Sequence, residues 1–214
     1  MFVKERMTHD PVVVAPDVSV PDALKLMHER HIRRLPVIDK GGRLVGIVSD
    51  RDLLRASPSP ATSLSVWEIT YLLNEVKIQS VMTAKVTTVT EDTPLEDAAR
   101  IMADNKIGGL PVMADGKLVG IITETDLFRA FVELLGASDS GVRITMLVRN
   151  QPGELAKLTR AIADSGGNIS ALAEYAGASP DERQLLVKTS GVGRDALVAA
   201  LTPAVLRITD VRET

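Results

Sequence analysis

Hydrophobic residues recur in a fixed pattern along the first two thirds of the chain. Residues 20–27 place apolar side chains at the i, i+3, i+4 and i+7 positions that favour an amphipathic helix, and residues 95–102 do the same. Further pieces return at an offset of 74 or 75 residues: Met7-Thr8 as Met82-Thr83, Leu35-Pro36-Val37 as Leu110-Pro111-Val112, and residues 46–53 as 120–127. A register kept across separate features predicts a tandem repeat.

Each repeat predicts the same order of elements. A short strand (12–14; 86–89) leads to a helix that starts near Pro21 or Pro94. Two strands in a hairpin follow (35–38 and 44–48; 110–113 and 118–122), and a last helix starts near Asp52 or Asp126. The proline-rich residues 56–61 read as a linker, and residues 62–76 as a helix between the repeats. We therefore expect domains at residues 1–60 and 61–135.

The last third predicts a different unit, over residues 136–214. Strands are expected at 142–148, 169–175, 184–189 and 205–211, with helices after the first and third. The first helix would bury Leu155, Leu158 and Ile162 and end at Gly166-Gly167 as an αL C-cap. This βαββαβ order is typical of a four-stranded antiparallel sheet with two helices on one face. The whole chain is then of the α+β class.

Composition narrows the function. Of 214 residues, 45% are hydrophobic and 25% charged, which is typical of a globular protein, and the net charge of −3 argues against nucleic acid as a partner. Cysteine is absent, apolar runs are too short to cross a membrane, and the start lacks a secretion signal, so we expect a cytoplasmic protein with no membrane partner. Only 3% of residues are aromatic, so mainly aliphatic side chains would have to pack against the ring of any flat ligand.

The repeat motifs carry a family resemblance. Leu-Pro-Val, followed by Gly-Ile-Val-Ser-x-x-Asp in one repeat and Gly-Ile-Ile-Thr-x-x-Asp in the other, resembles a tandem pair of CBS domains. Arg149-Asn150-x-Pro152-Gly153-x-Leu155 and Gly166-Gly167-Asn168-Ile169 resemble an ACT domain with a ferredoxin-like fold. The order of the three domains, together with residues 31–37, 50–52, 56–59 and 127–137, is similar to the acetoin-utilisation protein B family of bacteria.

Ser49 with Asp52, and Thr123 with Asp126, could hold a nucleoside. A carboxylate there can accept two hydrogen bonds from a ribose diol, the hydroxyl can reach a ribose or phosphate oxygen, and a helix start offers N–H groups to phosphate. The same spacing is also that of a helix capping box, with no ligand. The resemblance places adenine between the first strand and the residues that flank Pro-Val. The candidate nucleotide-binding residues are Val12, Val13, Ile32, Arg33, Arg34, Pro36, Val37, Ser49, Arg51, Asp52, Val86, Thr87, Ile107, Gly109, Pro111, Val112, Thr123 and Asp126.

The two repeats differ in basic residues. Arg33-Arg34 correspond to Gly108-Gly109, and Arg51 corresponds to Thr125. Since phosphate needs cations or N–H donors, we expect two clefts of unequal affinity.

For the third domain, the resemblance implies an amino-acid ligand across a dimer interface, at Asn150, Pro152, Gly153, Asn168 and Ile169. The alternative is structural: a turn at Asn150, a helix start at Pro152 and an αL residue at Asn168.

Enzymatic interpretations have little support. The three histidines are His9, His28 and His31, and no set of nucleophile, base and orienting residue can be assembled around them. His28 and His31 lack a third ligand, so we expect no metal.

The sequence favours a non-enzymatic regulatory homodimer that binds AMP, ADP or ATP as a regulatory ligand, with S-adenosylmethionine or NAD as alternatives. It would act on an unidentified target protein, and the resemblance implies a link to acetoin or acetyl-CoA metabolism. The competing interpretation is a constitutive dimerisation scaffold with vestigial clefts.

Overall fold

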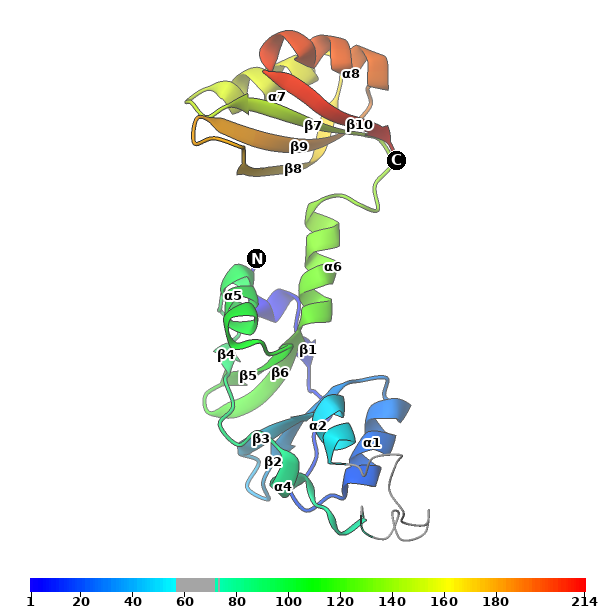
Figure 1. Cartoon of the computed structure of the whole chain (residues 1–214), viewed down its shortest axis with the longest axis vertical. Helices are drawn as coiled ribbons and strands as arrows, with labels where there is room; N and C mark the ends of the chain where they lie inside the picture. Colours follow the sequence, from blue (N-terminus) through cyan, green and yellow to red (C-terminus); the bar gives the residue numbers. More distant parts are fainter. Residues whose placement is uncertain (57–71, 73) are drawn as a thin grey trace. The chain divides into compact units, whose positions relative to one another are not determined.

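The computed structural model describes residues 1–56, 72 and 74–214, which form two compact units, Met1–Leu127 and Phe128–Thr214 (Figure 1). Most of the expected linker at 56–61 and of the expected helix at 62–76 lies outside the described residues.

The first unit contains the two repeats. Its elements are η1 (Val3–Glu5), β1 (Thr8–His9), α1 (Val20–Glu29), β2 (Arg34–Ile38), β3 (Leu44–Ser49), α2 (Asp50–Arg55), α4 (Ile78–Val81), β4 (Val89–Thr90), α5 (Leu95–Asn105), β5 (Gly109–Ala114), β6 (Lys117–Thr123) and α6 (Glu124–Leu134), which continues into the second unit. The two hairpins and the helices expected near Pro21, Asp52, Pro94 and Asp126 are confirmed. The expected strand at 86–89 is found only as Val89–Thr90. The expected strand at 12–14 reduces to Val14, because only this residue pairs with Val37 of β2.

Each helix follows from local sequence. In α1, Ser19 is the N-cap and Pro21 lies in the first turn, where its missing N–H costs no hydrogen bond. The α1 side chains of Val20, Ala23 and Met27 are at most 3% exposed and line the core of the first repeat. The helix face predicted from the apolar spacing is therefore the buried one.

Each repeat completes its sheet with a strand from the other. In the second repeat the order is β1-β6-β5-β4, so Thr8, which precedes the first repeat, pairs with Ile121 of β6. In the first repeat β2 pairs with β3, and Thr83, which precedes the second repeat, pairs with Ile47 of β3. The leading segments of the repeats (residues 3–9 and 78–84) are thus exchanged. Ile78 packs in the core of the first repeat for the same reason.

The repeated Met-Thr and Gly-Ile motifs meet at these crossings. A Cβ atom at Gly120 would lie 2.5 Å from Sδ of Met7 and 3.1 Å from the carbonyl oxygen of Thr8. Gly46 has the equivalent contact with Met82. Each glycine lets the exchanged methionine approach the strand backbone, which explains why the sequence repeats both motifs.

The second unit has the expected βαββαβ order: β7 (Val142–Arg149), α7 (Glu154–Asp164), β8 (Asn168–Ala176), β9 (Glu182–Ser190), α8 (Arg194–Leu201), η2 (Thr202–Ala204) and β10 (Arg207–Glu213). The antiparallel sheet has the order β10-β7-β9-β8. Leu158 and Ile162 of α7 share one core with Leu197 of α8 and with β7 and β9, so both helices cover the same face (Figure 1).

One expected core position of this unit is wrong. Leu155 is 41% exposed, whereas Glu154 is only 5% exposed. The buried line of α7 runs through Glu154, Leu158 and Ile162, which are four residues apart. Glu154 tolerates this position because Nζ of Lys157 donates to its carboxylate over 2.8 Å; Lys157 and then Gln151 lower the pKa of the Glu154 carboxyl below its ordinary value.

The exchange predicts that a methionine stabilises the repeat it does not belong to. Met7→Ala removes a buried side chain and should cost about 2–5 kcal/mol of unfolding free energy. Hydrogen exchange followed by mass spectrometry should show the largest rise at residues 117–123. Met82→Ala, its matched control, should raise exchange mainly at residues 44–49. A rise confined to residues 34–49 for Met7→Ala would contradict the exchange.

Candidate functional site

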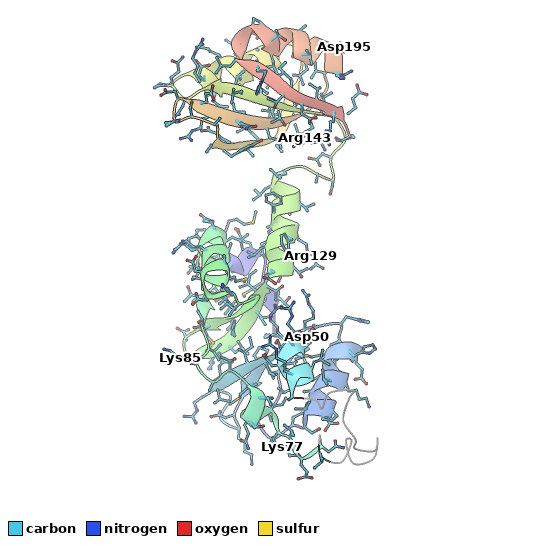
Figure 2. The ribbon with its side chains drawn as sticks, viewed as in Figure 1. Asp50, Lys77, Lys85, Arg129, Arg143 and Asp195 are labelled. Carbon is cyan, nitrogen blue, oxygen red and sulfur yellow. The ribbon has the colours of Figure 1, made fainter. Side chains whose placement is uncertain are left out.

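A cavity of about 480 Å³ lies between the two repeats. We call it the inter-repeat cavity; it is lined by Arg33, Arg34, Ile47, Ser49, Asp50, Arg51, Asp52, Thr83, Lys85, Val86, Thr87, Lys106, Ile107, Gly108, Gly109 and Glu124. Figure 2 labels Asp50, at the start of α2, and Lys85, on the segment that leads to β4. Because residues 83–87 cross from the sheet of the first repeat to that of the second, they form one wall. The volume falls in the range of about 300–1,000 Å³ that is typical of small-molecule sites.

Ser49 and Asp52 form a capping box at the start of α2. Oγ of Ser49 donates to Oδ2 of Asp52 over 2.6 Å, its backbone N–H donates to the same oxygen over 2.9 Å, and the N–H of Asp52 donates back to Oγ over 3.3 Å. The backbone N–H of Asp52 is therefore already hydrogen-bonded within the helix cap. Thr123 and Asp126 repeat the first two hydrogen bonds.

A serine paired with an aspartate three residues later does not by itself mark a ligand site in this chain. Ser19 and Asp22 at the start of α1 share the side-chain part of this arrangement, with Oγ donating over 2.6 Å and the N–H of Asp22 donating over 3.3 Å. Neither residue lines the inter-repeat cavity. What distinguishes Ser49 and Asp52 is the cavity in front of them.

Arg34 joins the repeats at the edge of the cavity. Its guanidinium lies 3.6 Å from the carboxylate of Glu124, and its side chain is 20% exposed. A Cβ atom at Gly108 would overlap Nη2 of Arg34, so the glycine makes room for the arginine of the other repeat. Burial lowers the pKa of Arg34 below its ordinary value, and the carboxylate of Glu124 acts in the opposite direction.

Half of the expected nucleotide-binding residues line this cavity: Arg33, Arg34, Ser49, Arg51, Asp52, Val86, Thr87, Ile107 and Gly109. The rest do not. Pro36, Val37, Pro111 and Val112 are buried, and Val12, Val13, Ile32, Thr123 and Asp126 are partly exposed elsewhere in the first unit. Lys85 and Lys106, which the sequence did not single out, also line the cavity. Lys85 directly follows the exchanged segment 78–84, and nothing in local spacing signals that exchange.

The expected amino-acid site of the second unit has structural uses. The side-chain amide of Asn150 donates to the carbonyl of Pro180 over 2.8 Å, and Gly153, with φ of +89°, is the N-cap of α7. Pro152 precedes that helix rather than starting it, and Asn168 begins β8 in extended conformation rather than in αL. Asn150, Pro152, Gly153 and Asn168 are exposed, and Ile169 is partly buried.

Comparison with known proteins decides the family. The CBS domain model matches residues 3–59 and 78–133, together more than half of the chain. The chain belongs to the CBS-domain family. The model of a TTHA0829-like ACT domain matches residues 140–212, so the CBS pair is followed by an ACT domain.

Solved structures resemble the CBS pair. A protein named for acetoin utilization (AcuB) from Vibrio cholerae is 36% identical, with a TM-score of 0.53, over 64% of this chain and 95% of that one. CBSX2 in complex with AMP is 39% identical, with a TM-score of 0.51, over 61% and 96%. The CBS pair of protein MJ0100 in complex with 5′-methylthioadenosine and S-adenosyl-L-methionine is 30% identical, with a TM-score of 0.51, over 65% and 98%.

The described residues contain no group of three or more His, Asp or Glu side chains that could hold a metal ion. Within the same residues, no helix is long and apolar enough to span a membrane.

The contact between Arg34 and Gly108 predicts a non-additive pair of substitutions. Gly108→Ala should lower the free energy of unfolding by about 1–3 kcal/mol, because the added methyl group displaces the guanidinium from Glu124. The double variant Arg34→Ala, Gly108→Ala removes the overlapping group and should cost less than the sum of the single changes. Urea denaturation measures all three variants. Strictly additive costs would show that the two residues do not interact.

Proposed function

We propose that this chain is a non-enzymatic regulatory protein whose CBS pair binds an adenine nucleotide, AMP, ADP or ATP, in the inter-repeat cavity. The observation that carries the proposal is the cavity itself, whose lining contains Ser49 and Asp52 together with Val86 and Ile107. The second oxygen of Asp52 can accept from a ribose hydroxyl, and the aliphatic side chains can pack on adenine.

The relatives support the choice of ligand. CBSX2 is in complex with AMP, and the MJ0100 pair is in complex with two adenosine compounds, so adenosine is common to both. The regulatory role follows from the architecture: a ligand that contacts both repeats can favour one arrangement of them over another, provided that it binds the two arrangements unequally.

The groups that line the cavity suit binding better than catalysis. No histidine is among its lining residues, and the chain contains no cysteine. Asp52, one of its three acidic residues, already accepts two hydrogen bonds from Ser49. Binding therefore accounts for this arrangement better than chemistry does.

We also propose an oligomeric state, a compartment, a second ligand and a metabolic link for this chain. We assign the ACT domain a role in a homodimer in the cytoplasm, with an amino acid as a second ligand near Gly153, where a Cβ atom would meet nothing within 4 Å. The similarity to the Vibrio cholerae protein supports a link to acetoin or acetyl-CoA metabolism, through a target protein still to be identified.

Thermal unfolding with added AMP, ADP or ATP tests nucleotide binding. At a ligand concentration of 100 times Kd, the folded state should gain about 2.7 kcal/mol. Asp52→Asn should abolish most of this gain, because the amide cannot serve as a charged acceptor for the ribose hydroxyls.

The matched control is Asp22→Asn, which alters a similar serine–aspartate pair away from the cavity and should retain the full ligand effect. An equal gain in Asp52→Asn would contradict the assignment of Asp52. If no adenine nucleotide stabilises the unsubstituted protein, the dimerisation scaffold is the better interpretation.

A further inference from the structure

Basic side chains dominate the inter-repeat cavity. Its lining contains five of them, Arg33, Arg34, Arg51, Lys85 and Lys106, against three acidic ones, Asp50, Asp52 and Glu124. The cavity therefore has two more positive than negative groups, in a chain whose net charge is −3. A positive cavity on an acidic protein concentrates anions at that point.

Most of these cations lack a partner. Arg34 pairs with Glu124, whereas the side chains of Arg33, Arg51, Lys85 and Lys106 make no hydrogen bond or ion pair within the described part of the chain. The charges of Arg33 and Arg51 both act to lower the pKa of Arg34, as neighbouring like charges do. Cations held together in this way repel one another, and a bound polyanion would relieve that repulsion.

The basic residues of the cavity are not part of the repeated pattern. At the offset of 75 residues, Lys85 corresponds to Asp10 and Lys106 to His31; at the offset of 74, Arg51 corresponds to Thr125. The capping pairs, and Gly46 with Gly120, are kept in both repeats, whereas these lysines and arginines are not. The cations are therefore not needed for the CBS fold itself.

We infer that the inter-repeat cavity is a site for an adenosine polyphosphate, ADP or ATP in preference to AMP, and that Arg51, Lys85 and Lys106 select for the length of the phosphate chain. This inference rests on the proposed function and specifies its ligand. Arg51 comes from the first repeat, and the two lysines come from the second, so a longer phosphate chain would add contacts to both repeats beyond those that the nucleoside makes.

The test is calorimetry on the full chain without divalent cations, using adenosine, AMP, ADP, ATP and inorganic tripolyphosphate. Because each added phosphate meets further cations, ATP should bind at least about tenfold tighter than AMP. Its affinity should also fall more steeply with salt. In the variant Arg51→Thr, Lys85→Asp, Lys106→His, which carries the residues of the other repeat, ATP should lose at least about tenfold in affinity and AMP less than about threefold.

Lys40→Asp is the control for net charge, because Lys40 is exposed in a hairpin turn and does not line the cavity. This substitution should change the affinity for ATP less than about twofold, because salt screens the charge of an exposed side chain away from the cavity. Equal affinities for AMP and ATP would overturn the preference and leave nucleotide binding standing. Absence of binding by every nucleotide would overturn both. Tripolyphosphate binding as tightly as ATP would overturn the adenosine assignment, and a normal melting curve without ligand excludes misfolding of the variant.

Discussion

The exchange of leading segments between the two repeats is the constraint on which the rest of the CBS pair depends. Two short backbone pairings, Thr8 with Ile121 and Thr83 with Ile47, complete each sheet with a strand from the other repeat. The crossing segment 83–87 then faces Ser49 and encloses the inter-repeat cavity. The first repeat does not complete its core alone, since Ile78, from the leading segment of the second, belongs to that core. Folding of the pair and formation of the cavity are therefore the same event.

The two repeats have similar folds, and a few sequence differences between them make the pair asymmetric. Where the first repeat has Arg33-Arg34, the second has Gly108-Gly109, and the missing Cβ of Gly108 leaves the space that Arg34 occupies. Arg34 then reaches Glu124 of the other repeat. The outcome is an inter-repeat cavity whose lining is mainly basic. A ligand there contacts both repeats, which is the physical requirement for a signal that depends on their arrangement.

Much of this could be predicted from the sequence, because helices, hairpins and capping boxes are local. The boundaries of α1 and β5 fall within about two residues of those expected. The exchange could not be predicted in this way: it pairs residues more than thirty positions apart, and a two-residue strand has no periodicity to detect. Lys85 was missed for that reason. Apolar spacing predicted that Leu155 would be buried. Leu155 is exposed instead, because Glu154, whose carboxylate is paired, lies in the buried position of the helix.

The most direct test of the central claim is a nuclear magnetic resonance titration of the backbone amides with ADP. If the cavity between the exchanged repeats is the binding site, amides at residues 49–52, 83–87 and 106–109 should shift together, with one saturation curve. The ACT domain and the helix cap at Ser19 should remain unshifted at the concentrations that saturate the cavity. Shifts confined to a single repeat, or to residues outside the lining, would contradict the account.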